Sequence, residues 1–123
     1  MNEKNFVKAM KKASATLDHD AVKERVKDLI DRRSATDLGY PRGHKDLIIA
    51  MEECGELIQE ISKKLRGKDN RLDLLQELVD VQLSLYAIQE VCGISEEDLS
   101  RAINVKIGFD TKKEKKRQQL GNK

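Results

Sequence analysis

Four acidic residues of the chain form two pairs with the same spacing. Glu53 and Glu56 are three residues apart, and so are Glu77 and Asp80. Because residues three apart lie on the same face of a helix, each pair directs both carboxylates to one side. Carboxylates that converge repel one another and raise each other's pKa unless a cation neutralises them. Such a set of oxygen ligands is what Mg²⁺ or Mn²⁺ prefers, so the spacing predicts a metal site.

The two pairs lie in two long helices that the hydrophobic pattern predicts, one over residues 45–65 and one over about 70–92. The polar turn 66–70 is short enough to make these helices antiparallel neighbours, so that the acid pairs face each other. The second helix is apolar nearly all round, and such helices are usually buried. Two acids in a buried helix need a cation or a hydrogen-bonding partner, because an unpaired buried charge is very costly.

The first acidic helix has an ordinary amphipathic pattern. Taken alone, it favours a solvated acidic face, as on many surface helices. Taken together with the acids of the second helix, it favours four carboxylates around a metal ion. Its apolar stripe consists of Leu47, Ala50, Met51, Cys54, Ile58, Ile61 and Leu65, and Glu52, Glu53, Glu56 and Glu60 lie on the other side.

Both motifs resemble those of a known enzyme family. Glu53-Cys54-Gly55-Glu56-Leu57, followed by Glu77-Leu78-Val79-Asp80-Val81, resembles the ExxE…ExxD signature of the MazG-like, all-α nucleoside triphosphate pyrophosphohydrolases. The resemblance covers roughly residues 20 to 113. It implies an all-α fold of the four-helix-bundle type that assembles as a homodimer or homotetramer. It also implies Mg²⁺ held by Glu53, Glu56, Glu77 and Asp80, and cleavage of a (d)NTP to the monophosphate and pyrophosphate.

Other residues are candidates for contacts with the substrate. In the resembled family a lysine on the last helix, a polar residue a turn later and a further basic residue face the phosphates, which implies this role for Lys106, Asp110 and Lys113. Tyr40, in the loop before the acidic helix, and His44, at the start of that helix, are candidates for base or phosphate contacts. The alternatives are a packed turn for Tyr40 and a helix cap for His44. Glu52 or Glu60 is a candidate for orienting the attacking water.

Length and composition restrict the protein class. The chain of 123 residues fits one small domain, and its 38% hydrophobic and 3% aromatic residues predict a core of Leu, Ile and Val. The net charge of +2 creates no strong field around the whole protein that would favour one class of partner. Cys54 and Cys92 are interpreted as small buried hydrophobes in a reducing compartment. The lack of a membrane span or a signal sequence predicts a cytoplasmic protein.

The rest of the chain is predicted to flank the acidic helices. Residues 1–17 form an N-terminal extension, 18–110 the helical domain and 111–123 a basic tail. A helix over Ala21–Arg33 is capped by Asp18 or Asp20, residues 34–43 form a loop, and a last helix starts at the capping box of Ser95. Gly108 is expected to interrupt or bend this last helix. The short basic run at 112–117 lacks interleaved aromatic residues, which argues against nucleic-acid binding.

Two observations frame the functional hypothesis. A single small bundle has too little inner surface for both the stripe of the first acidic helix and the all-round apolar second helix, so self-association is expected. The chain has no Walker P-loop, no cysteine–histidine nucleophile and no dinucleotide-binding fingerprint. The alternative to the enzyme is a catalytically silent helical bundle with a structural metal, or an interaction module whose basic tail contacts nucleic acid.

Overall fold

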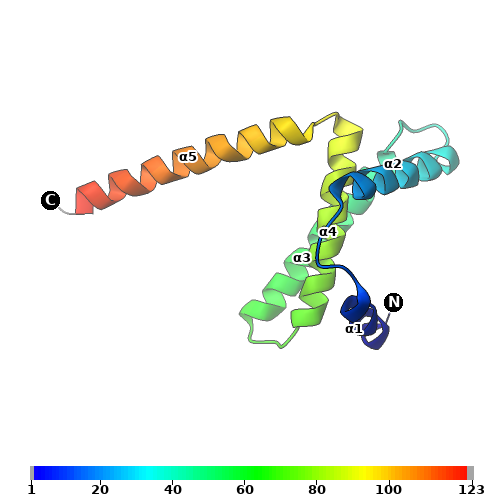
Figure 1. Cartoon of the computed structure of the whole chain (residues 1–123), viewed down its shortest axis with the longest axis horizontal. Coiled ribbons are helices and arrows are strands. Elements are labelled where there is room, and N and C mark those ends of the chain that lie inside the picture. The colour runs from blue at the N-terminus through cyan, green and yellow to red at the C-terminus, as the bar shows by residue number, and fades with distance from the viewer. Residues whose placement is uncertain (1, 122–123) are drawn as a thin grey trace. The chain divides into compact units, whose positions relative to one another are not determined.

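A computed structural model describes residues 2–121, and these residues form helices and no strands (Figure 1). The all-α prediction is therefore confirmed. The helices are α1 (Glu3–Lys12), α2 (His19–Thr36), α3 (His44–Leu65), α4 (Arg71–Cys92) and α5 (Glu96–Gly121). The chain divides into two compact units, Met1–Val91 and Cys92–Lys123. No helix among the described residues combines the length and the hydropathy that a bilayer crossing requires.

The ends of the helices are set by the capping residues that the sequence contains. Asp18 precedes α2, and its Oδ1 accepts a hydrogen bond of 3.1 Å from the N–H of Ala21. Ser95 precedes α5 in the same way, because its Oγ accepts from the N–H of Asp98 at 3.0 Å. These contacts satisfy N–H groups that have no partner within the helix. Helix α2 continues to Thr36, three residues beyond the predicted end, which shortens the predicted loop.

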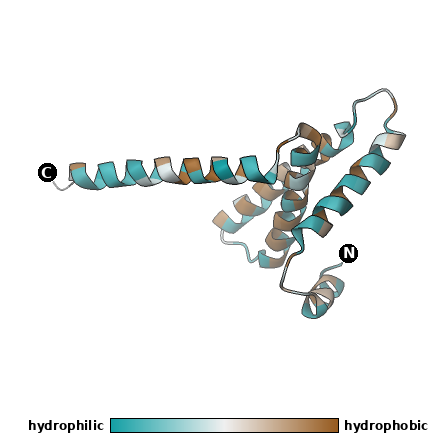
Figure 2. Cartoon of the chain, turned by 45° about the horizontal axis from the view of Figure 1, so that its top comes forward, coloured by the Kyte–Doolittle hydropathy of each residue, from teal (hydrophilic) through white to brown (hydrophobic). Residues whose placement is uncertain are grey.

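Helices α3 and α4 form an antiparallel hairpin, and they lie side by side in Figures 1 and 2. The turn between them contains Gly67, whose φ of +81° suits a residue without Cβ. The side-chain amide of Asn70, just before α4, donates to the main-chain oxygen of Glu60 at 2.8 Å and to its Oε2 at 2.7 Å. This buried contact joins the end of α3 to the start of α4 and fixes their register.

Helix α2 packs on this hairpin through a small aliphatic core. Val26 and Ile30 of α2 are buried together with Ala87 of α4. Ion pairs tie the same helices at their ends: Arg33 Nη1 lies 2.5 Å from Asp46 Oδ1 of α3. The loop residue Arg42 bridges α2 and α4, because it binds Asp31 at 2.8 Å and Glu90 at 3.2 Å. The pKa of Arg42 is raised, mainly by its hydrogen bond to Asp31.

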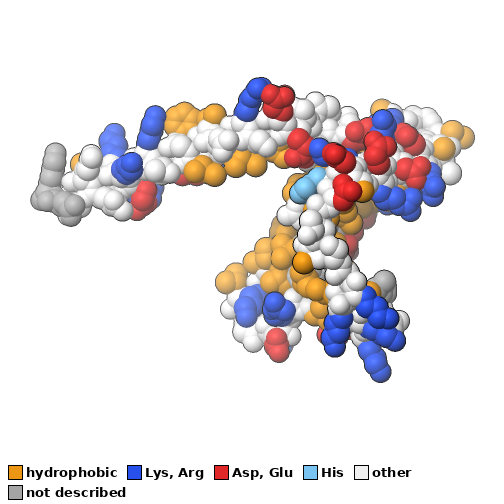
Figure 3. Space-filling model, viewed as in Figure 1, with side chains coloured by type: hydrophobic (Ala, Val, Ile, Leu, Met, Phe, Trp, Pro, Cys, Tyr) orange, Lys and Arg blue, Asp and Glu red, His pale blue; other side chains and the backbone are white. Residues whose placement is uncertain are grey.

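The apolar side of the hairpin is largely exposed in the single chain. On α3, Met51, Ile58 and Leu65 are exposed to 74%, 66% and 83%. Figure 2 shows hydrophobic residues along both α3 and α4, and Figure 3 shows hydrophobic side chains at the surface of this region. Cys54 and Cys92 are exposed too, so the prediction that they are buried is wrong. Cys54 belongs to the α3 face that points away from the core, and Cys92 is the last residue of α4.

Helix α5 runs without a break from Glu96 to Gly121. The prediction that Gly108 interrupts this helix is wrong, because a single glycine lowers helix stability without ending the hydrogen-bond ladder. The basic run at 112–117 is helical as well. Lys106, Asp110 and Lys113 are all exposed on this helix.

Gly43, just before α3, packs closely against Val91 of α4. It is buried, has a φ of +87°, and donates its N–H to Ser34 Oγ at 3.0 Å. A Cβ at this position would lie 2.3 Å from Cγ2 of Val91. Valine has a stiff side chain, so it cannot turn aside as a long flexible residue would. Gly43 is therefore required both by its backbone conformation and by this contact.

We expect Gly43→Ala to lower the free energy of unfolding by about 2–4 kcal/mol, through backbone strain and overpacking together. Gly39→Ala is the matched control. Its φ is +88° and nothing lies within 4 Å of the position of a Cβ, so it should cost only about 1 kcal/mol. Urea denaturation of both variants measures the difference. Equal losses in the two variants would show that the contact with Val91 is unimportant.

Candidate metal centre

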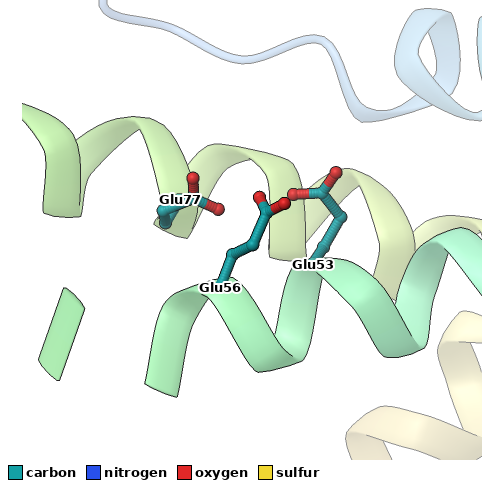
Figure 4. Close-up of side chains that lie close together, drawn as sticks. All are labelled: Glu53, Glu56 and Glu77. Carbon is teal, nitrogen blue, oxygen red and sulfur yellow. The ribbon is translucent and has the colours of Figure 1, made fainter. Parts of the chain in front are cut away.

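Three acids of the two motifs, Glu53, Glu56 and Glu77, lie close together between α3 and α4 (Figure 4), where Glu53 and Glu77 are half-buried and Glu56 is exposed. Glu53 and Glu56 project from α3 and Glu77 from α4, and one carboxylate oxygen of each lies within 4.8 Å of the others. The i,i+3 spacing puts the two α3 acids on one face, and the antiparallel turn brings α4 opposite. Oxygens bound to one Mg²⁺ ion lie at most about 4.2 Å apart, because each Mg–O bond is about 2.1 Å. Small side-chain rotations would therefore suffice to bring these oxygens onto one ion.

Asp80 lies next to this group of three, although it is not part of it. Its charge raises the pKa of both Glu53 and Glu77. It also lines the same cavity as Glu53. The four acids of the two motifs therefore form one electrostatic unit, with three carboxylates in mutual reach and the fourth at its edge.

Burial and mutual repulsion shift the titration of these acids strongly. The pKa of Glu53 is raised to about 7, first by desolvation, then by the charges of Asp80, Glu56 and Glu77, and finally by a hydrogen bond with Glu56. The pKa of Glu77 is also raised, again first by desolvation and then by Glu56 and Asp80. Oε2 of Glu53 and Oε2 of Glu77 are buried and have no hydrogen-bond partner. Buried oxygens without donors are costly, and a cation would satisfy both.

Glu60, on the same helix, is a buried acid whose carboxylate oxygens have hydrogen-bond partners. It is buried, with its carboxylate bound to Lys63 Nζ at 2.8 Å and to the amide of Asn70 at 2.7 Å. These two hydrogen bonds lower the pKa of Glu60, and the hydrogen bond from Lys63 has the larger effect. The i,i+3 spacing of Glu60 and Lys63 was visible in the sequence, but the role of Asn70 was not. Glu60 is thus occupied, whereas the buried oxygens of Glu53 and Glu77 are not.

Other predicted site residues are not part of the carboxylate group. Glu52 is exposed on α3, one residue before Glu53. Tyr40 stacks on His44 with ring centroids 4.1 Å apart, and His44 Nδ1 lies 3.0 Å from Asp37 Oδ2. Nine residues separate His44 from Glu53, which is about 13 Å along a helix. Tyr40 and His44 thus form a small cluster at the start of α3, and their contact with substrate stays a prediction.

Lys106, Asp110 and Lys113 belong to α5, in the second compact unit. Their spacings of four and three residues place them on one face of that helix. All three are exposed. The role in phosphate binding that the family resemblance implies therefore stays a prediction for them.

A cavity of about 450 Å³ lies beside the acids, between α2, α3 and α4. Glu53 and Asp80 line it, and so do Arg33 and Asp46. Asp46 is 2% exposed, which makes it one of the most deeply buried side chains of the described residues. Sequence reasoning missed it, because an aspartate in the first turn of a helix usually interacts only with the helix dipole. Arg33 lies in the last turn of α2, where a basic residue is also expected to interact only with the helix dipole.

Comparisons with known proteins identify no relative. The chain matches no protein-family profile, no curated protein and no solved structure.

The metal-free protein should lose stability as the pH rises from about 4.5 to about 7. Glu53 binds its proton more tightly in the folded state than in the unfolded chain, where its pKa is 4.5. Folding is therefore favoured below pH 4.5, and this contribution is lost as the pH rises through the folded pKa of about 7. The raised pKa of Glu77 acts in the same direction. Glu60 affects stability only at lower pH. Because its pKa is lowered in the folded state, its stabilising contribution is lost as the pH falls below about 4.5.

Thermal unfolding in EDTA across this pH range measures the effect. Glu53→Gln removes the titrating group and should flatten the profile between pH 4.5 and 7. The control is Glu24→Gln, on the exposed side of α2, which should leave the profile unchanged. A wild-type midpoint that is constant or rises over this window would contradict the raised pKa.

Proposed function

We propose that the protein is a Mg²⁺-dependent nucleoside triphosphate pyrophosphohydrolase, which acts in the cytoplasm on a (d)NTP to yield the monophosphate and pyrophosphate. The observation that carries this proposal is the convergence of the ExxE and ExxD carboxylates between α3 and α4, with buried oxygens that lack donors. These oxygens fit a divalent cation, since hard cations take carboxylate ligands. A surface acidic patch would leave all of its oxygens in water, whereas one oxygen each of Glu53 and Glu77 is buried.

In this proposal Glu53, Glu56, Glu77 and Asp80 hold the metal. A Mg²⁺ ion held by these residues would supply positive charge to neutralise the phosphates and to lower the pKa of the attacking water. Mn²⁺ has the same ligand preference and is a possible substitute. The reaction is an attack of water on the α-phosphorus, with pyrophosphate as the leaving group.

The chain itself contributes proton transfer and orientation. Glu52 is exposed beside the ligand set and is the candidate that orients the water and accepts its proton. Without a cation, Glu53 holds a proton near neutral pH because its pKa is about 7. Cation binding therefore has to displace that proton, which makes metal affinity increase with pH up to about pH 7. The lysines Lys106 and Lys113 remain the candidates for binding the phosphates.

The test of this function is a panel of NTPs and dNTPs with MgCl₂, scored for both pyrophosphate and orthophosphate. We expect pyrophosphate from at least one nucleotide. Glu56→Gln and Asp80→Asn should each reduce kcat by about a hundredfold or more, because each removes a charge that holds the metal. Glu24→Gln is the control and should retain full activity. Release of orthophosphate alone, or wild-type activity in either variant, would refute the assignment.

Thermal unfolding separates the enzyme from a silent bundle with a solvated acidic face. A cation that binds only the folded state stabilises it by about 2.7 kcal/mol at a hundredfold excess over its Kd. Millimolar MgCl₂ should therefore raise the midpoint by several degrees more than NaCl of equal ionic strength, and Glu77→Gln should remove the difference. Equal shifts in the two salts would mean that the acids bind no specific cation.

We also propose that the protein self-associates through the apolar side of the α3–α4 hairpin, as a homodimer or homotetramer. Exposed apolar patches of this extent usually mark an interface. The face includes Leu47, Met51, Ile58, Ile61 and Leu65 of α3, and α4 adds Leu78, Val79 and Leu85, all of them at least 36% exposed. The charged side of α3 is used inside the protomer, so the apolar side is the one left for a partner.

Light scattering at micromolar concentration should give a mass of at least twice 14.0 kDa. Ile58→Asp should shift the protein toward the monomer, because it buries a charge in the interface. The control is Leu38→Asp, in the loop before α3, where leucine is 83% exposed and outside the hairpin. A monomer mass for the wild type, or dissociation by Leu38→Asp alone, would contradict the proposed interface.

A further inference from the structure

Helix α1 carries its apolar and its basic side chains on opposite faces. At about 100° per residue, Phe6, Val7 and Met10 lie within an arc of about 100°. The lysines of this helix lie within another arc of about 100° on the other side, and they are Lys4, Lys8, Lys11 and Lys12. Figure 3 shows Lys and Arg side chains gathered over α1. A helix with this separation is amphipathic and has a strongly basic face.

The apolar face of α1 is largely uncovered in the protomer. No residue of α1 is buried: Phe6 is half-buried, and Val7 and Met10 are 38% and 47% exposed. The first turn is capped by Asn2, whose Oδ1 accepts a hydrogen bond of 2.8 Å from the N–H of Asn5. A helix of ten residues is marginally stable in water even with such a cap. A surface that covers the apolar face would therefore stabilise α1.

The small size of this apolar face restricts what can cover it. A specific protein interface buries about 800 Å² on each partner, from roughly 20–30 residues, so three apolar side chains are too few to hold a protein partner. A nucleic acid would contact the lysines alone and leave the apolar face in water. The surface of a bilayer with anionic lipids satisfies both faces at once, because the lysines reach the headgroups while the apolar side chains enter the acyl region.

We propose that α1 docks on a membrane surface that contains anionic lipids, with the helix axis in the plane of the surface. Phe6, Val7 and Met10 enter the boundary between headgroups and acyl chains, and the lysines bind the anionic headgroups. The helix does not cross the bilayer, because its length of about 15 Å is half of the hydrocarbon thickness of about 30 Å. This docking goes beyond the proposed function and requires neither the carboxylate group nor a nucleotide.

The test is co-sedimentation of the full-length protein with lipid vesicles. One set of vesicles consists of phosphatidylcholine alone, and in the other set about a third of the lipid is phosphatidylserine. We expect the affinity for the anionic vesicles to be at least about tenfold higher, because each lysine near an anionic surface strengthens binding by about fivefold. Added NaCl should weaken binding to the anionic vesicles, since it screens the attraction between lysines and headgroups.

Substitutions by glutamine test the two faces of α1 separately, because glutamine has nearly the helix propensity of lysine and methionine. Lys8→Gln combined with Lys11→Gln should lower the affinity for anionic vesicles by about twentyfold. Met10→Gln should lower it by about tenfold, because a polar side chain no longer enters the acyl region. The control is Lys115→Gln combined with Lys116→Gln in α5, where residues 111–119 contain no apolar side chain, and it should bind like the wild type.

The variants change no buried residue of α1, so loss of folding does not obscure the result. A wild-type protein that fails to sediment with anionic vesicles, or that binds both sets of vesicles equally, would overturn the inference. Equal losses in the α1 and α5 lysine variants would overturn it too, because positive charge anywhere on the protein would then suffice. If Met10→Gln left vesicle binding unchanged but lowered the mass in light scattering, the apolar face would cover a second copy of the chain instead of a lipid surface.

Discussion

The structure depends on which face α3 turns toward the rest of the protomer. At about 100° per residue, Asp46, Ala50, Glu53 and Glu60 lie on one face of this helix, and they are all buried or half-buried. Most of the long aliphatic side chains lie to one side of that face and remain exposed, whereas Ile49 and Leu57 are half-buried. Burial of apolar area alone would favour the opposite rotation, with the aliphatic stripe inward and the acids in water. Within a single protomer, specific polar contacts therefore oppose that tendency and favour the observed rotation.

These contacts lie at both ends of the helix. Near its start, Asp46 is bound by Arg33 of α2. Near its end, Glu60 is bound by Asn70 and Lys63. Gly43, just before the helix, packs so closely on α4 that no other residue fits without a shift. The middle of the helix, at Glu53, is then placed opposite Glu77 and Asp80 whether or not a cation is present. The ends thus impose on the middle a repulsion that only a proton or a metal relieves.

Most of the helical architecture could be predicted from the sequence, because periodicity, caps and the glycine turn act locally. Asp18 and Ser95 cap the helices as their positions indicated. The pairing of the two acid motifs followed from spacing and from the short turn. What the sequence could not reveal depends on tertiary contacts. The burial of Asp46 requires Arg33 from another helix, and the exposure of Cys54 follows from the rotation of α3, which no local pattern encodes. The prediction that Gly108 interrupts the last helix was wrong for a related reason: the low helix propensity of one residue is too small an effect to end a long helix.

The same rotation connects the candidate chemistry with the candidate assembly. When the acidic face of α3 points inward, its aliphatic face points outward. A single rotation of α3 therefore produces both the carboxylate group and the exposed apolar surface. Each buried acid at the ends of α3 has a cationic partner from the protein itself, Arg33 for Asp46 and Lys63 for Glu60. Glu53, between them, is surrounded by Glu56, Glu77 and Asp80 and is pushed toward its protonated form. Three acids on one helix face thus have two protein cations among them. The position that lacks one is where the acids of the two motifs come closest, and this is where we propose that a cation from solution binds.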